Sequence, residues 1–309
     1  MDRLDAMRTF ISIVDEGSLS AAARRLRRSP VAVTRALALL EAHVGATLLT
    51  RSTRAMRLTP AGERYLRACR NVMAELASAE ESVGSEQAEL RGRLSVTAPA
   101  TFGRLHVRPA LDGFLDLHPE VSLRLLLLDR VVDLVNEGFD AAIRIGHLPD
   151  SSLTAVKLGQ VRRMLCASPD YLSRHPPLRR PDDLARHASI VFSQGGADEA
   201  WRFSDPSGRR LRPQRQYARL SLNDAVAAVA SAVAGHGVTR VMSYQAEAEL
   251  RSGRLVRVLR EFEPAPVPVH LLSVARRPAT ARLRSLIDYA APMLRGALAR
   301  IETFLDTDL

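Results

Sequence analysis

The sequence predicts an α/β protein with a helix–turn–helix near its N-terminus, and three observations support this. Residues 17–45 contain two short helical patterns joined by a tight turn. From residue 92 onward, short apolar runs of β-type composition alternate with helical patterns. Such alternation is typical of βαβ units with a mainly parallel sheet. The chain has 309 residues, enough for two or three domains with cores of their own.

The composition is that of an ordinary globular protein, with 46% hydrophobic and 25% charged residues. No signal peptide is visible, and the longest apolar runs are too short to span a bilayer, so we expect a cytoplasmic protein with no membrane partner. The cysteines, Cys69 and Cys166, lack metal-ligand spacing. We therefore expect no disulfide, no metal site and no cofactor.

The net charge is +10, and among the basic side chains Lys157 is the single lysine. This preference for arginine suits nucleic-acid binding, but genomic base composition is the simpler explanation for it. The location of the charge is more informative. Residues 1–65 hold 11 arginines against 6 acidic residues, a net charge of +5. Such a surplus is typical of a DNA-binding surface.

Residues 1–16 have the apolar spacing of a helix, and two further helices follow. Ser18 is the expected N-cap of the first of these, while Ser29 and Pro30 provide the start of the second. Gly45 ends the second helix, because glycine readily adopts a positive φ. The exposed face at the start of this helix is where a recognition helix contacts DNA. The predicted contacts there are Ser29, Pro30, Val31, Thr34 and Arg35.

Residues 47–58 form two apolar segments around a polar turn, which predicts a β-hairpin. Beside a helix–turn–helix such a hairpin is a wing. Its arginines, Arg51 and Arg54, would lie at or near the tip, against the DNA backbone or minor groove. The alternative is a solvated basic loop.

A long helix is predicted from Pro60 to about Leu90, with apolar residues at heptad spacing. An isolated helix of this length would expose its apolar seam, so we expect dimerisation, with packing against its own chain as the alternative. The predicted dimerisation residues are Cys69, Val72, Leu76 and Val83.

Elements of the α/β part follow from the same patterns. The expected strands are 94–98, 121–128, 141–145, 164–167, 189–192, 217–222, 238–242 and 269–274. The expected helices are 107–118, 131–137, 169–174, 223–234 and 279–305, the last with a break near Pro292. These elements form two similar sets, which indicates two lobes.

The ordered set of motifs resembles the family of LysR-type transcriptional regulators over essentially the whole chain. The matching N-terminal residues are Phe10, Gly17-Ser18-Leu19-Ser20-Ala21-Ala22, Leu26, Ser29, Val33-Thr34, Leu40-Glu41, Gly45, Leu48-Leu49, Arg51, Arg54 and Leu58-Thr59-Pro60-Ala61-Gly62. The later matches are Gly92-Arg93-Leu94-Ser95-Val96 and residues 114–119, 129–134, 137–146 and 166–172. The family usually has Gln-Pro after Ser29, where this chain has Pro30-Val31, so a frequent DNA donor is absent.

The resemblance implies a winged helix–turn–helix domain over residues 1–60, a linker and dimerisation helix over 61–90, and an effector-binding domain over 91–309. It implies two Rossmann-like lobes of the type II periplasmic-binding-protein kind. Lobe one would comprise residues 92–163 and 269–309, and lobe two residues 164–268. The effector would bind between the lobes, and homodimers would pair into a tetramer.

Candidate effector-binding residues follow the ends of the predicted strands. A helix N-terminus after Pro99 presents N–H groups suited to an anion such as a carboxylate. Thr101 can add a hydroxyl or simply cap the helix. Arg144 can bind a carboxylate, or pair with Asp140 or Asp129. The whole predicted set is Pro99, Thr101, Phe102, Arg144, Gly146, His147, Phe192 and Asn223.

Together these observations predict a regulator that binds promoter DNA, itself and a small effector, with RNA polymerase as a candidate further partner. No constellation of residues favours catalysis, so an enzyme is not expected. Closure of the lobes on the effector would change how the dimers are oriented on DNA. One alternative is a ligand-independent repressor with a vestigial cleft. Another is a metabolite-binding or enzymatic protein whose N-terminal helices serve only oligomerisation.

Overall fold

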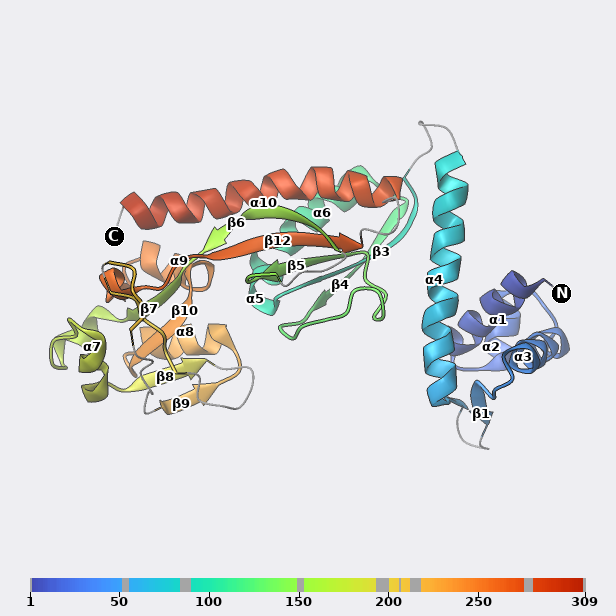
Figure 1. Ribbon diagram of the computed structural model, residues 1–309, viewed down its shortest axis with the longest axis horizontal. Coiled ribbons are helices and arrows are strands. Elements are labelled where there is room, and N and C mark those ends of the chain that lie inside the picture. The colour runs from blue at the N-terminus through green and yellow to red at the C-terminus, as the bar shows by residue number, and fades with distance from the viewer. Residues whose placement is uncertain are drawn as a thin grey trace. The chain divides into compact units, whose positions relative to one another are not determined.

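The computed structural model describes residues 2–51, 56–83, 90–148, 153–192, 200–205, 207–211, 218–274 and 280–307. They form two compact units, one that contains residues 1–88 and one that contains most of residues 89–309. Figure 1 shows the helices of the first unit and the two sheets of the second. Among the described helices, none is both long enough and apolar enough to cross a membrane.

The N-terminal unit is a helical domain with a two-stranded hairpin. Its elements are α1 (Arg3–Glu16), α2 (Leu19–Arg25), α3 (Pro30–Val44), β1 (Leu49–Arg51), β2 (Met56–Leu58) and α4 (Pro60–Val83). The core lies between the helices, where Phe10, Val33 and Leu40 are almost completely buried. The helix–turn–helix and its hairpin are therefore organised as the spacing of apolar residues predicts.

Helix ends in this unit are set by the capping residues that the sequence indicates. The Ser18 hydroxyl accepts a hydrogen bond from the Ala21 N–H at 3.1 Å, and the Ser29 hydroxyl accepts one from the Ala32 N–H at 3.2 Å. At the other end of α3, Gly45 adopts a left-handed conformation with φ of +68°. These caps confirm the predicted boundaries of α2 and α3.

A close contact between the hairpin and α4 requires a glycine at position 62. The Thr59 N–H donates to the carbonyl of Leu48 at 3.0 Å, and the Thr59 hydroxyl accepts from the Gly62 N–H at 2.9 Å. A Cβ on Gly62 would lie 2.0 Å from the Leu48 carbonyl oxygen. Any side chain there would therefore separate the start of α4 from the hairpin.

Helix α4 is described as far as Val83, and the remainder of the predicted helix, residues 84–89, lies outside the described residues. Leu90 lies outside the helix and packs against the hydrophobic core of the second unit. The heptad spacing of Leu90 with Val83 is therefore not a helical relationship.

Two five-stranded sheets organise the described part of the second unit, one in each lobe. In spatial order, the lobe-one sheet contains β4 (Val121–Leu127), β3 (Gly92–Ala98), β5 (Ala141–Ile145), β12 (Val267–Val274) and β6 (Leu153–Val161). The lobe-two sheet contains β11 (Val256–Val258), β7 (Arg163–Ala167), β10 (Val238–Met242), β8 (Ser189–Phe192) and β9 (Ala218–Leu222).

Each sheet is mixed, which corrects the expectation of mainly parallel pairing. In lobe one, β3 pairs in parallel with β4 and β5, whereas β12 is antiparallel to β5 and β6. In lobe two, β8 pairs in parallel with β9 and β10, whereas β7 is antiparallel to β10 and β11. The reversed strand in each lobe is the one that arrives from the other lobe, and such direct crossings have no sequence signature of their own.

The helices of the second unit are mostly short. They are α5 (Ala100–Phe102), the π-helical turn η1 (Gly103–Val107), α6 (Arg108–Leu117), α7 (Pro169–Ser173), the 3₁₀ turn η2 (Pro181–Arg186), α8 (Ala225–Val233), α9 (Ser243–Arg251), the 3₁₀ turn η3 (Arg260–Phe262) and α10 (Ala281–Thr307). Figure 1 shows α10 running along β6 and β12.

Two predictions about helices in this unit are wrong. Residues 131–137 do not form a helix, because the Asp133 carboxylate accepts hydrogen bonds from the N–H groups of Val135 and Asn136 and closes a turn instead. Helix α10 continues through Pro292 without the expected break. Pro292 is exposed, so its ring projects away from the packed side of the helix.

Candidate functional sites

The predicted DNA-contact residues lie together at the start of α3. Ser29, Pro30, Thr34 and Arg35 are exposed, and Val31 keeps 77% of its surface accessible. Behind them, α3 is held by its buried residues, which are Val33, Ala36, Leu37 and Leu40. The same periodicity that buries one side of α3 thus presents the other side to solvent.

The wing is placed against α3 by a glutamate. Glu41 accepts hydrogen bonds at one carboxylate oxygen from the N–H groups of Leu48 and Leu49, at 2.7 and 3.2 Å. Arg51 is the last residue of β1 and pairs with Met56 of β2. Arg54 lies outside the described residues. The hairpin itself is therefore as predicted, and its position relative to α3 is fixed within the unit.

Ion pairs engage only some arginines of this unit. Arg28 forms two 2.7 Å hydrogen bonds with Asp5, and this guanidinium holds the pKa of the Asp5 carboxyl below its ordinary value. Arg25 pairs with Glu16 at 3.2 Å. Within the described part of the chain, no ion pair involves Arg24, Arg27 or Arg35, all of which are exposed. These three arginines are therefore exposed to solvent on and between α2 and α3.

The predicted dimerisation residues do not share one environment. Cys69 is completely buried among the core residues of its own unit, which corrects its assignment to a seam facing a partner helix. Burial raises the pKa of its thiol to about 11. Val72 is 41% exposed and Leu76 is half-buried, while Val83 is the last residue of α4.

At the carboxyl end of β3, the predicted anion position is already in contact with a carboxylate of this chain. Pro99 precedes α5, and the next N–H, that of Ala100, donates to Asp129 at 2.9 Å. Asp129 follows β4, so two adjacent strand ends meet here. Thr101 is largely buried, at 8% exposure. The sequence predicts free N–H groups here but not the Asp129 carboxylate, because Ala100 and Asp129 are 29 positions apart.

Phe102 is completely buried, which corrects its assignment as a ligand contact. Its ring meets the ring of Tyr244 edge-on at 5.2 Å and lies 4.9 Å from the ring of His106. Tyr244 belongs to α9 in lobe two, so these rings pack one lobe against the other. Burial raises the pKa of Tyr244 and lowers that of His106. Gly103 allows η1 to approach β4, because its Cβ would lie 2.3 Å from Leu127.

A row of basic side chains crosses three strands of lobe one. His270 of β12 is in register with Arg144 of β5 and Lys157 of β6. Burial lowers the pKa of His270, and the nearby charges of Lys157 and His147 lower it further. Arg144 donates from Nη1 to the carbonyl of Leu128 at 3.3 Å. Neither His270 nor Lys157 was predicted, because strand register is not visible in the sequence.

The remaining predicted ligand residues also lie at strand ends. Gly146 follows β5 with φ of +148°, and open space surrounds the position that a Cβ would take. In lobe two, Phe192 is half-buried and ends β8 beside Leu222 of β9. Asn223 is exposed and directly follows β9. Phe192 and Asn223 are therefore brought together at one end of the lobe-two sheet.

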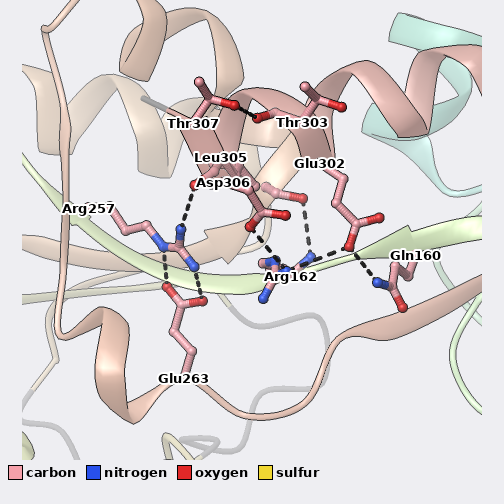
Figure 2. Close-up of polar contacts among 10 residues, drawn as sticks. Gln160, Arg162, Arg257, Glu263, Glu302, Thr303, Leu305, Asp306 and Thr307 are labelled. Atoms are coloured by element: carbon pink, nitrogen blue, oxygen red, sulfur yellow. Dashed lines mark hydrogen bonds and ion pairs between the residues drawn. The ribbon is translucent and has the colours of Figure 1, made fainter. Parts of the chain in front are cut away.

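The two crossings between the lobes are tied to the C-terminal end of α10 (Figure 2). Arg162, the residue between β6 and β7, contacts Glu302 at 3.6 Å and Asp306 at 3.4 Å. Arg257 forms two 2.6 Å bonds with Glu263 on the second crossing, and donates to the carbonyl of Leu305 at 3.4 Å. A helix C-terminus attracts cations, so both arginines are placed favourably.

An exposed helix–turn–helix with a hairpin, followed by two lobes joined by paired crossings, defines a ligand-responsive DNA-binding regulator. Residues 4–63 match the bacterial regulatory helix-turn-helix model of the lysR family, and residues 87–295 match the LysR substrate binding domain. The chain therefore belongs to the LysR family of transcriptional regulators, which bind DNA and carry an effector-binding domain.

Similar proteins match this chain over almost their whole length. The probable HTH-type transcriptional regulator LtrA of Klebsiella pneumoniae is 32% identical over 94% of each chain. The virulence activator AphB of Vibrio cholerae is 26% identical, with a TM-score of 0.60 over 94% of this chain and 99% of that one. LysG of Corynebacterium glutamicum, solved with bound effector Arg, shares the fold with a TM-score of 0.62 at 23% identity. The match covers 95% of this chain and 98% of that one.

Proposed function

We propose that this regulator recognises promoter DNA through the start of α3 and the β1–β2 wing. The observation that carries the proposal is the exposed cluster at the start of α3, where Thr34 and Arg35 lie beside Val31 and Arg35 forms no ion pair with any described residue. A hydroxyl, a guanidinium and a small apolar group are the chemical types that read base edges in the major groove. Arg51 and Arg54 of the wing add contacts to the DNA backbone.

The regulator acts as a homodimer that pairs into a tetramer on DNA, in the cytoplasm. Support comes from α4, where Val72 is exposed and Leu76 is half-buried on a 24-residue helix. An apolar surface on a long helix favours packing against a second copy. RNA polymerase would then be contacted from the promoter-bound assembly.

The effector is a small organic anion bound at the strand ends of the two lobes. The supporting feature is the row formed by Arg144, His270 and Lys157, since guanidinium, imidazole and ammonium groups in register on one sheet face are hydrogen-bond donors suited to an anion. Gly146 and His147 extend this row, and Phe192 and Asn223 provide apolar and amide contacts from lobe two. Binding would alter the angle between the lobes and so the spacing of bound half-sites.

A ligand-independent repressor is the second candidate, and one observation favours it. The Ala100 N–H, which an effector carboxylate would use, donates to Asp129 of the same chain. If that contact persists in every state, the Ala100 N–H is not available to an effector. Binding of an organic anion separates the two candidates.

The test has two stages with the full-length protein. In the first stage, selection from a pool of random duplexes identifies the operator. Light scattering then compares the oligomeric state of Leu76→Asp with that of the control Arg67→Asp, which alters an exposed position on the same helix. Monomers are expected for Leu76→Asp alone. A panel of organic carboxylates is then screened by thermal shift.

The effector proposal requires a carboxylate that raises the Tm of the wild type but not of Arg144→Gln, with the exposed His236→Gln as the control. No shift with any carboxylate, together with intact operator binding, would favour the ligand-independent repressor. Absence of any enriched duplex in the selection would contradict DNA recognition itself.

A further inference from the structure

Arg27 occupies a backbone position that glycine normally fills. Helix α2 ends with the N–H of Arg27 donating to the carbonyl of Arg24 at 3.1 Å, and that of Arg28 donating to the carbonyl of Ala23 at 2.9 Å. These two bonds form a Schellman motif, whose closing residue must adopt a left-handed conformation. Arg27 does so, with φ of +52°.

The same unit uses glycine where it ends its other helices in this way. Gly17 follows α1 with φ of +70°, and Gly45 follows α3 with φ of +68°. A Cβ makes this conformation less favourable, so glycine would be the more stable choice at position 27 as well. Residues held in such conformations gather at functional sites. The arginine side chain is therefore expected to have a role that outweighs its backbone strain.

The surroundings of Arg27 indicate what that role is. The neighbouring Arg25 and Arg28 are bound to Glu16 and Asp5. Arg27 is exposed, and among the described residues it has no acidic partner. The Arg28–Asp5 pair fastens the turn to α1, so the backbone that carries the Arg27 side chain is held in place on both sides.

The turn also determines where the Arg27 guanidinium can act. Two residues later, Ser29 caps the N-terminus of α3, the end that carries the predicted base contacts. When a recognition helix lies in the major groove, the turn before it lies beside the phosphates that border the groove. The helix N-terminus itself favours an anion at this place.

We propose that Arg27 binds a DNA phosphate beside the recognition helix and is retained in a strained turn for that contact. This inference rests on DNA binding by the N-terminal unit. A phosphate contact carries no sequence information, so it contributes equally to the operator and to any other duplex. It adds one charge to the set that makes DNA binding sensitive to salt.

The test compares Arg27→Gly with the wild type as full-length proteins. Tm is measured by thermal unfolding, and affinity by fluorescence anisotropy on the selected operator and on a random duplex, from about 50 to 200 mM salt. Glycine relieves the strain, so Tm should be unchanged or higher. Affinity should fall by about 3- to 10-fold for both duplexes, and the log–log salt slope should fall by about one.

Three matched variants separate charge from backbone effects. Arg27→Lys keeps the charge and should preserve the slope, whereas Arg27→Asn tolerates the left-handed turn without the charge and should bind DNA like Arg27→Gly. Arg202→Ala removes an exposed arginine of the second unit and should change neither the affinity nor the salt slope.

Unchanged affinity and slope in Arg27→Gly would overturn the proposal. So would a lower Tm with a loss of binding that Arg27→Asn does not reproduce. Failure of the wild type to bind either duplex would instead contradict DNA binding by the whole unit.

Discussion

One buried arginine ion pair of the second unit contrasts with the surface pairs of the N-terminal unit. In the N-terminal unit the ion pairs are at the surface: the side chains of Arg28 and Asp5 keep 36% and 30% of their area accessible. In the second unit, Arg257 and Glu263 keep only 4% and 6%. The surface arginines lie around the exposed start of α3, whereas the buried arginine fastens the crossing between two lobes.

The difference in burial determines how much each ion pair contributes to the free energy of unfolding. Exposed ion pairs in general contribute about 0–1 kcal/mol, because water and salt screen them. Removing one partner of a buried pair leaves the other charge without compensation and costs about 3–5 kcal/mol. The comparison therefore predicts a ranking of arginine substitutions, from Arg257 through the exposed face of α3 to the surface pairs.

The largest effect is expected for Arg257→Met. The substitution leaves the Glu263 carboxylate buried and removes the donor to the Leu305 carbonyl. We expect the second unit to lose about 3–5 kcal/mol of unfolding free energy. Denaturant unfolding followed by fluorescence measures this directly, because Trp201 is the single tryptophan of the chain and is buried in lobe two.

The double variant Arg257→Met/Glu263→Leu is the control for this prediction. Removing both charges should restore most of the stability, since the penalty arises from an unpaired carboxylate rather than from the loss of attraction. A single variant that loses less than about 1 kcal/mol would mean that the pair is as well solvated as a surface pair, and the contrast between the units would not hold.

The next effect is expected at the DNA surface. Arg35→Ala should weaken operator binding by about 1–3 kcal/mol and relax the preference at one base pair, because a guanidinium can bind a guanine edge with two hydrogen bonds. Arg25→Ala is the matched control in the same unit, since Arg25 is engaged by Glu16. Equal losses in the two variants would indicate a general charge effect and not a base contact by Arg35.

Local signals explain why the N-terminal unit was predictable from the sequence. A serine cap, a proline at the first helical position and a glycine at the end each act within a few residues, and the structure places all three for α3 as predicted. The hairpin follows from the same kind of local pattern. Cys69 was misassigned because a heptad pattern does not distinguish a residue facing a partner helix from one facing its own core.

Long-range features explain why the second unit was predicted less well. Strand β6 was missed because polar residues such as Lys157 and Gln160 interrupt its apolar pattern at the sheet edge. Helix α9 was also missed, and with it the contact between Phe102 and Tyr244. The basic row depends on strand register, and the Asp129–Ala100 bond joins the segment after β4 to the start of α5. Neither relation is encoded by neighbouring residues.

A smaller effect on stability is expected from protonation of His106, which lies between the lobes. Burial beside Phe102 and Tyr244 lowers the pKa of His106 below its ordinary value of 6.5, with Glu247 opposing this and Arg300 adding to it. The unfolded chain therefore takes up this proton first as the pH falls. The stability due to neutral His106 is full above about pH 6.5 and decreases below it.

Thermal unfolding between about pH 7.5 and 5.5 checks this prediction. Burial also lowers the pKa values of His187 and His270, so His106→Gln should reduce, rather than abolish, the fall in Tm on acidification. The exposed His236→Gln is the control substitution. An identical profile for His106→Gln and the wild type would show that this imidazole titrates alike in the folded and unfolded chain.

The smallest effect is expected for Arg28→Ala in the N-terminal unit. Its pair with Asp5 is solvated, so removal should lower the Tm of this unit by only about 2 °C near neutral pH, and by less at about 1 M salt. Arg28 also holds the pKa of Asp5 below its ordinary value of 3.8. The contribution of the pair is therefore full above that pH and disappears as the pH falls through the lower pKa of the folded protein. Thermal unfolding at about pH 7 and pH 3, with and without salt, would detect it. A loss as large as that of Arg257→Met would mean that this bidentate surface pair contributes as much to stability as a buried pair, and that surface position alone does not make an arginine dispensable for folding.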